Sequence, residues 1–398
     1  MHPLQVLILR HKQDKDALVF EEACARAFEG ASNASGYLAT GEDLGVEIKR
    51  FDAAPAVLGT VDTLLNATSH TLVIVILDEG GVQDATFVDW LEQCWQIVRA
   101  SGQRHQFLLF LQDERTGNKL RNAQPNFGTL QAITIQQLGE RAIRPALISL
   151  RSLHEARVLL AQDLPGDGKH QPGWLMFFIS HAKLDGLPLA HSLLHVLDSI
   201  PWLKDFYDAR DLESEPDWQQ ALHEAAACSL LIILRTDAYE ERPWCRQEAL
   251  WAEEYGTPAI LVEARPGLAY PSGDLQLDRM PSVRIPDGNL YRILHAAIRQ
   301  GVRYLLFQQR VLQMKANGTF PAGAEVRAFS DAPSSAALLR VCRELLPLVA
   351  APGSTAFVVY PDPPLRTGLF EAANALVTAI SPAIRLVTPK TLATAGVL

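Results

Sequence analysis

The chain has 398 residues, of which 48% are hydrophobic and 20% are charged, so it is long enough for two or three domains and apolar enough to fill their cores. Its 36 basic and 45 acidic residues leave a formal net charge of −9, which disfavours direct nucleic-acid binding and a polybasic membrane anchor. No apolar run reaches the roughly 18–20 residues that span a bilayer, and we expect neither a membrane span nor a signal peptide. The five cysteines form no CxxC pair, which favours a reduced, cytoplasmic protein without a structural zinc site.

Short apolar segments of strand length alternate along the chain with segments of helical period. Most of these strands are apolar at consecutive positions, as in a parallel sheet covered on both faces, whereas residues 46–51 alternate and fit a sheet edge. The alternation predicts doubly wound, flavodoxin-like α/β domains. The expected strands are 4–9, 46–51, 72–77, 107–111 and 132–135 in the first half, and 175–179, 204–207, 230–234, 259–262 and 283–285 in the second.

Proline and glycine concentrate in residues 163–173, which we expect to be a linker. It would separate an N-terminal flavodoxin-like domain (1–162) from a second α/β domain (174–305). The two halves run in a similar order, since a histidine follows each opening strand and a tryptophan leads a later helix in both. This order fits a duplication, and it equally fits two independent domains of one class.

Residues 320–398 carry one further αβ pattern. Helices are expected at 335–349 and 369–380, and strands at 355–360 and 384–387. The pattern predicts a small C-terminal α/β domain. The chain ends soon after the last of these strands, which is also what a truncated form of a longer protein would show.

Polar residues gather where the strands of the second domain end. Ser180 and His181 end its first strand, Asp208 follows its second, and Tyr239 follows its third. Ligands of parallel sheets bind outside the carboxyl ends of the strands, so these residues are expected at the rim of a site. A helix then opens at Trp244-Cys245 and carries Glu248 on the same face, one turn beyond the tryptophan.

In this order, the motifs resemble those of the TIR (Toll/interleukin-1 receptor) domain family over residues 174–300, about a third of the chain. The matching motifs are Phe178-Ile179-Ser180-His181, then Asp208 with its loop, then Thr236-x-x-Tyr239 leading to Trp244-Cys245-x-x-Glu248. The resemblance is closest to bacterial TIR domains. It implies a TIR-like parallel sheet for this domain.

The resemblance implies that Glu248 is the catalytic residue of an NAD⁺ glycohydrolase. A carboxylate beside the ribose would stabilise the positive charge that forms as nicotinamide leaves, and the products would be nicotinamide and ADP-ribose or a cyclic ADP-ribose isomer. NAD⁺ would be the substrate, and neither a cofactor nor a metal is expected. The residues expected to contact the substrate are Phe178, Ser180, His181, Asp208, Asp211, Tyr239 and Trp244, of which Tyr239 and Trp244 would wall the nicotinamide pocket.

The resemblance further implies a bacterial immune effector that is activated by self-association through its TIR domains. The flanking domains would then bind an activating ligand or a partner protein. Two alternatives stay open: a non-enzymatic interaction module that acts through the loop 208–218, and a receptor for a nucleotide signal.

The sequence departs from the family pattern in two loops. Ser214-Glu215-Pro216 stands where a glycine is usual, and Arg242 stands where a serine often precedes Trp-Cys. Both departures concern pocket shape and assembly. The first half has Cys94 at the position corresponding to Glu248, so a duplicate there would be degenerate.

Other chemistries are weaker in this sequence. Ser180 and His181 are adjacent on a strand and point to opposite faces, which excludes a hydrogen-bonded dyad. Cys245 has no neighbouring base to activate it, and His191 with His195 lack the glutamate of a zinc protease motif. No glycine-rich phosphate loop occurs, which disfavours a tightly held dinucleotide cofactor and an NTPase.

Overall fold

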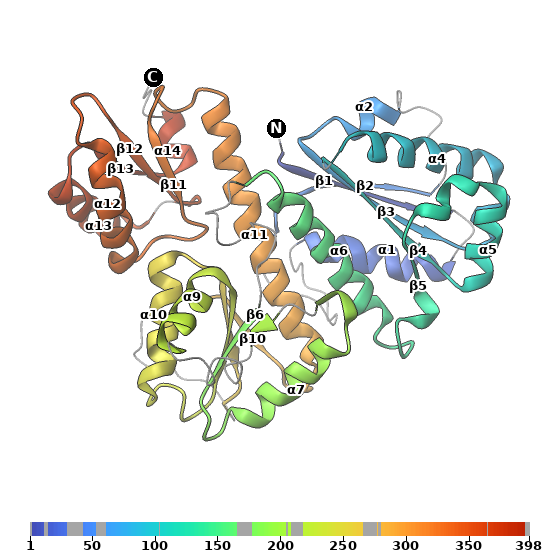
Figure 1. The fold of residues 1–398 in the computed structure, drawn as a ribbon, viewed down its shortest axis with the longest axis horizontal. Helices are drawn as coiled ribbons and strands as arrows, with labels where there is room; N and C mark the ends of the chain where they lie inside the picture. The colour runs from blue at the N-terminus through green and yellow to red at the C-terminus, as the bar shows by residue number, and fades with distance from the viewer. Residues whose placement is uncertain are drawn as a thin grey trace. The chain divides into compact units, whose positions relative to one another are not determined.

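The computed structural model describes residues 2–11, 15–29, 43–52, 61–102, 104–164, 177–203, 206–207, 218–265, 277, 280–363 and 365–394. The chain divides into two compact units, Met1–Asp163 with Leu294–Val302, and Leu164–Ile293 with Arg303–Leu398. Figure 1 shows parallel sheets flanked by helices, one sheet in the first unit and two in the second. The expected α/β class is therefore confirmed. Most of the expected linker 163–173 lies outside the described residues.

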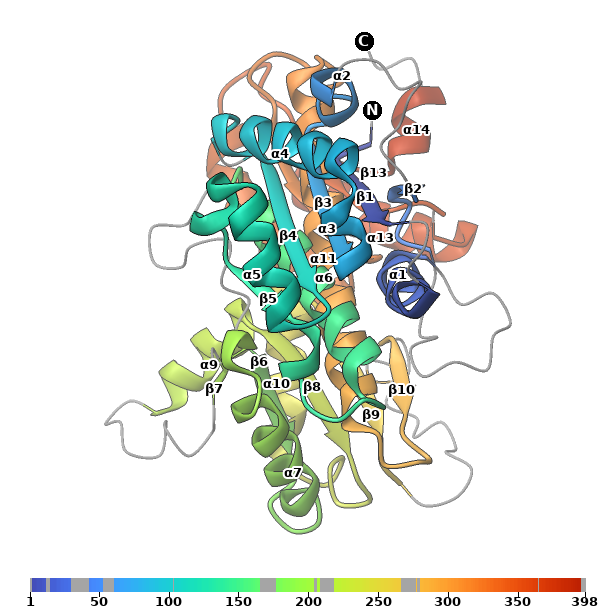
Figure 2. The same ribbon diagram turned by 90° about the vertical axis from the view of Figure 1, so that its right-hand side faces the viewer.

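The first unit holds a five-stranded parallel sheet in the order β2-β1-β3-β4-β5, which is the flavodoxin order. The alternating strand β2 lies at the edge, as its pattern predicts. The helices α1 and α6 cover one face of the sheet, and α4 lies on the other face (Figure 2). The strands are β1 (Leu4–Arg10), β2 (Glu47–Phe51), β3 (His70–Leu77), β4 (His105–Leu111) and β5 (Ala132–Thr134), and the α-helices are α1 (Lys15–Phe28), α2 (Val61–Leu65), α3 (Glu79–Gln83), α4 (Ala85–Ala100), α5 (Glu114–Ala123) and α6 (Arg144–Ala161).

Burial explains why these strands are apolar at consecutive positions. All eight residues of β3 are buried, because helices cover both faces of the sheet. Helices α4 and α5 begin at acidic caps: Asp84 accepts from the Phe87 amide, and Asp113 accepts from the Thr116 amide.

Residues 294–302 of helix α11 (Leu290–Ala316) belong to the first unit. There, Arg299 donates to the Ala27 and Phe28 carbonyls at the end of α1, and His295 lies 3.1 Å from Ser149 on α6. Burial lowers the pKa of His295 to about 3, so this side chain is neutral. The domain boundary expected at 305 falls inside α11, a helix whose 27 residues include no proline to end it earlier.

The first sheet of the second unit has the order β10-β9-β8-β6-β7 and is also parallel throughout. In chain order this is again 2-1-3-4-5, so the two five-stranded sheets share one topology. Helices α9 and α10 pack together on one face (Figure 1). The strands are β6 (Phe177–His181), β7 (Phe206–Tyr207), β8 (Leu230–Arg235), β9 (Ala259–Glu263) and β10 (Ser282–Arg284), and the helices are α7 (Leu187–Asp198), α9 (Trp218–Cys228) and α10 (Pro243–Tyr255).

The second sheet of this unit has three parallel strands in the order β11-β12-β13. Its last two strands and the helices α12 and α13 lie close to where the sequence predicts them, whereas β11 and the short helix α14 are not predicted. The strands are β11 (Glu325–Ala328), β12 (Ala356–Val359) and β13 (Ile384–Val387), and the helices are α12 (Ser335–Leu345), α13 (Thr367–Ile380) and α14 (Pro389–Thr394). Among the described helices of both units, none is long and apolar enough to cross a bilayer.

Candidate active site

The carboxyl end of β6 meets the second turn of α10. Ser180, the fourth residue of β6, donates a hydrogen bond to the Glu248 carboxylate. Ser180 is 1% exposed and Glu248 is 8% exposed. Helix α10 begins at Pro243, where a proline is favourable because its missing amide would have no helical partner. The face of α10 that carries Glu248 also carries Cys245, so this face packs against the sheet.

Tyr239, in the segment that follows β8, places its hydroxyl next to Ser180. This hydroxyl is 2.7 Å from the Ser180 hydroxyl and donates to the Cys245 carbonyl over 3.1 Å. Tyr239 is fully buried, and so is Phe178, which packs in the core with Cys245. Both were expected to contact substrate. In the described structure Tyr239 instead supports Ser180, and Phe178 fills the core.

Burial raises the pKa of Glu248 to about 7, and the hydrogen bond from Ser180 acts in the opposite direction. The carboxyl therefore exists in both protonation states near neutral pH. Burial, together with the charge of Glu248, raises the pKa of Cys245 to about 12. This thiol stays protonated near neutral pH, and its Sγ lies 3.5 Å from the His181 carbonyl oxygen.

The segment after β6 is tied to the segment after β8. Asp185 accepts hydrogen bonds from the Thr236 hydroxyl (2.6 Å) and the Ala238 amide (2.9 Å). Burial acts to raise the pKa of Asp185, but these hydrogen bonds hold it below its ordinary value. A Cβ at Gly186 would lie 2.9 Å from the Ala182 carbonyl oxygen, so this tight turn requires glycine.

A buried ion-pair cluster, which sequence reasoning missed, fixes the carboxyl ends of β8 and β9. The Arg235 side chain, 3% exposed, lies 2.6 Å from Glu240 and 3.5 Å from Glu263. Arg265 also binds Glu263, over 2.7 Å. The available signal was an arginine directly after five apolar residues, since a charge at the end of a buried strand needs partners.

Large apolar side chains are exposed in the segment after β6 and at the start of α10. Leu184 is 72% exposed and Leu187 is 38% exposed, both after β6, and Trp244 at the start of α10 is 44% exposed. His181 is half-buried. Trp244 and His181 thus keep surface that a ligand can contact.

Two predicted substrate residues, Asp208 and Asp211, lie outside the described residues, as does the loop 208–217 that contains them. Within the described ranges, no three His, Cys, Asp or Glu side chains gather as the ligands of a metal ion would. In the first unit, Cys94 on α4 occupies the fourth position after Trp90 and is fully buried.

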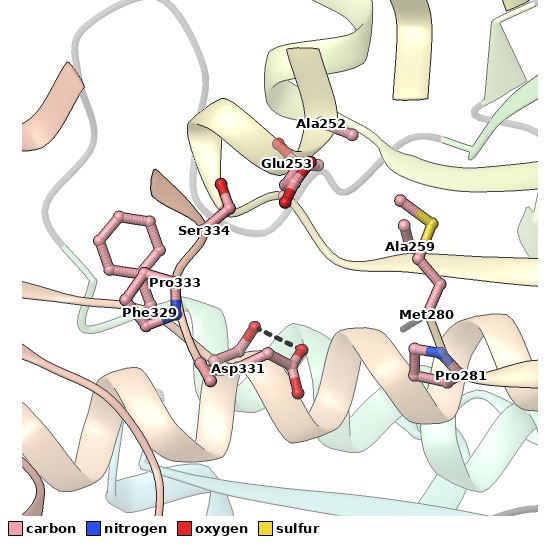
Figure 3. Close-up of a pocket in the computed structure, with 13 residues that line it drawn as sticks. Ala252, Glu253, Ala259, Met280, Pro281, Phe329, Asp331, Pro333 and Ser334 are labelled. Carbon is pink, nitrogen blue, oxygen red and sulfur yellow. Dashed lines mark hydrogen bonds between the residues drawn. The ribbon is translucent and has the colours of Figure 1, made fainter. Parts of the chain in front are cut away.

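A cavity of about 340 Å³ lies at the C-terminal end of α10 (Figure 3). Its lining includes two carboxylates, Glu253 on α10 and Asp331 in the segment after β11, together with apolar side chains such as Phe329 and Met280. Asp331 also lies 3.3 Å from Arg303. Neither Glu248 nor any described residue that is predicted to contact the substrate lines this cavity, so it is separate from the site around Glu248.

Comparison of the chain with protein-family models gives no match, and comparison with curated proteins gives none either.

Proposed function

We propose that residues 174–305 form a TIR domain that cleaves the bond between nicotinamide and ribose in NAD⁺, with Glu248 as its catalytic residue. The observation that carries this proposal is the buried Glu248 carboxyl, hydrogen-bonded to Ser180 between the carboxyl ends of β6 and β8. In a 2-1-3-4-5 sheet, the neighbouring first and third strands form the switch point at which such sheets bind ligands.

The chemistry requires little beyond a placed negative charge. When the bond between C1′ and the pyridinium nitrogen breaks, the electron pair goes to nicotinamide and positive charge develops on the ribose. A carboxylate stabilises this charge, and its effect is larger in a buried setting than in water. Water then adds to C1′ and loses a proton, which gives ADP-ribose; attack by an adenine nitrogen would give a cyclic isomer. NAD⁺ is the substrate in this scheme.

The remaining substrate contacts are assigned according to exposure. His181 and Trp244 retain accessible surface near Glu248, so we assign them to the ribose–diphosphate and nicotinamide parts of NAD⁺. Asp208 and Asp211 stay predictions from the sequence. Ser180 is too deeply buried to reach a ligand, and its hydroxyl is engaged by Glu248.

Self-association belongs to the same proposal. The exposed side chains Leu184, Leu187 and Trp244 lie in the segments that border the site, and apolar surface of this kind favours protein contacts. A neighbouring copy would cover this surface and complete the pocket. A cytoplasmic bacterial immune effector, with an activating ligand or partner on the flanking domains, is the role we propose for the whole chain.

A non-enzymatic interaction module is the second candidate. It is favoured by the low exposure of Glu248, 8%, because a buried glutamate bonded to a serine can also serve structure alone. Nicotinamide release from NAD⁺ separates the two functions. The enzyme proposal expects release that Glu248→Gln abolishes and that Glu254→Gln, at another position on α10, leaves intact. The module expects no release from any of the three proteins.

A further inference from the structure

Three side chains from three separate segments form one hydrogen-bonded chain beside the proposed catalytic carboxyl. Glu248 from α10 contacts Ser180 from β6, Ser180 contacts Tyr239 from the segment after β8, and Tyr239 contacts the Cys245 carbonyl of α10. The two hydroxyl-bearing side chains are almost inaccessible, at 1% and 0% exposed. Each hydroxyl carries one proton, so the direction of every bond can be worked out for each state of the carboxyl.

When Glu248 is ionised, it can only accept, and Ser180 donates its one proton to the carboxylate. Tyr239 then donates either to Ser180 or to the Cys245 carbonyl. Both hydroxyl protons are paired in this state.

When Glu248 is protonated, the bonds can run the opposite way. Glu248 donates to Ser180, Ser180 donates to Tyr239, and Tyr239 donates to the Cys245 carbonyl. All three protons are again paired, and the last acceptor is a backbone oxygen that needs no proton of its own. The same atoms thus satisfy both forms of a carboxyl that has almost no contact with water.

We propose that Ser180 and Tyr239 are positioning residues that form a reversible hydroxyl relay, which holds Glu248 in one place while it gains or loses its proton. The proposal deepens, and rests on, the proposed NAD⁺ glycohydrolase function, in which Glu248 must be ionised when charge develops on the ribose. Ser180 and Tyr239 act through Glu248 and do not touch the substrate.

The titratable groups around the relay come from each segment that packs on it. Tyr239 follows β8, Cys245 belongs to α10, and His181 ends β6. Asp185 and Arg242 act electrostatically on Cys245 rather than directly on Glu248. Among the described side chains, only Ser180 changes the pKa of Glu248 through a direct hydrogen bond, and it lowers that pKa.

The relay predicts that two deletions of a hydroxyl move the titration of Glu248 in opposite directions. Ser180→Ala removes the donor to the carboxylate; because bonds to a charged acceptor are the stronger ones, the ionised form loses more and the midpoint rises by about 1 pH unit. Tyr239→Phe leaves that donor in place but removes the acceptor that Ser180 needs when Glu248 is protonated. The neutral form loses more, and the midpoint falls by about 1 pH unit.

The measurement is a carbon-13 NMR titration of the full chain labelled at the glutamate carboxyl carbon, with the Glu248 signal identified by its absence from Glu248→Gln. Matched controls remove buried hydroxyls elsewhere in the second unit: Ser229→Ala, whose hydroxyl bonds the Ala225 carbonyl, and Tyr360→Phe, whose hydroxyl accepts from the Leu365 amide. Both controls should keep the wild-type midpoint. If only Ser180→Ala folds, a midpoint that fails to rise still overturns the relay, because the Ser180 donor is its first link.

Opposite shifts with unchanged controls support the relay, and shifts in the same direction, or none, overturn it. The titration does not depend on turnover, so the two proposals can fail separately. Opposite shifts in a protein that releases no nicotinamide would retain the relay and reject the enzyme. Nicotinamide release that requires Glu248, with no shift in either variant, would retain the enzyme and reject the relay. In an active protein the relay further expects the variants to change kcat with little change in KM.

Discussion

Ser180 on β6 donates a hydrogen bond to Glu248 on α10. This contact joins two residues that are 68 positions apart in the sequence and are both buried in the second unit. One hydrogen bond offsets only part of the cost of burying a carboxylate, and the pKa of Glu248 accordingly stays raised, to about 7. A buried acid whose charged form is poorly compensated is unfavourable for stability at neutral pH, and such groups concentrate at functional sites.

Glu248→Gln should therefore stabilise the fold at high pH. Because the pKa of Glu248 is raised from 4.5 to about 7 on folding, the folded state binds more protons between these values, and stability falls as pH rises through this window. Glutamine does not titrate, so the variant does not lose this stability as the pH rises. Urea unfolding should show it more stable than wild type at pH 8, by up to about 3 kcal/mol, with the advantage shrinking towards pH 5.

The control for this experiment is Glu254→Gln on the same helix, which should follow the wild-type dependence on pH. A Glu248→Gln advantage that is equal at pH 5 and pH 8 would show that Glu248 titrates normally in the fold.

The proposed activity should also depend on pH. Stabilisation of the ribose cation requires ionised Glu248, so kcat/KM for NAD⁺ should rise about tenfold per pH unit well below pH 7 and level off above it, at the pKa of about 7. The check is nicotinamide release across pH 5–9 at subsaturating NAD⁺. A rate that is flat from pH 5 to pH 7 would contradict this role for Glu248.

The junction between α10 and the segment after β11 should be sensitive to a single methyl group. Gly256 ends α10 at a φ of 65°, and a Cβ there would lie 2.6 Å from the Phe329 ring. Gly318 has a similar φ of 73° after α11, but a Cβ there would meet nothing within 4 Å. Gly318→Ala should cost about 1–2 kcal/mol for the left-handed backbone alone.

Gly256→Ala should lose the same stability as Gly318→Ala for its backbone. It should lose about 1–3 kcal/mol more because the new methyl group must displace the Phe329 ring, which is the usual cost of overpacking a core. Urea unfolding of both variants checks the difference. Equal losses would show that Phe329 moves aside freely, and the close packing between α10 and this segment would then have no energetic weight.

The periodicity of the sequence predicted most of the strands because most are buried on both faces and apolar throughout. It failed at β11, where Glu325 and Arg327 interrupt a strand of four residues, and at α11, where a single helix serves both units. Strand pairing depends on contacts between distant segments, so the order of the sheets came from the expected fold class and not from any local pattern.

The candidate site was predicted in part. Motif spacing brought out Ser180, Tyr239 and Glu248 as site residues, and the structure brings these three together. Spacing gives no side-chain direction, so Tyr239 was expected to line a pocket although its ring is fully buried. The raised pKa of Glu248 results from burial by many neighbours, and a linear sequence does not display that.

The most direct test of the central claim compares nicotinamide release from NAD⁺ by the wild-type chain and by Glu248→Gln, each over a range of protein concentrations that allows self-association. Loss of a positioned carboxylate should lower kcat by about 10²–10⁴-fold while the fold remains intact. Equal release by the two proteins, or no release by the wild-type chain at any concentration, would contradict the assignment of Glu248 as the catalytic residue of an NAD⁺ glycohydrolase.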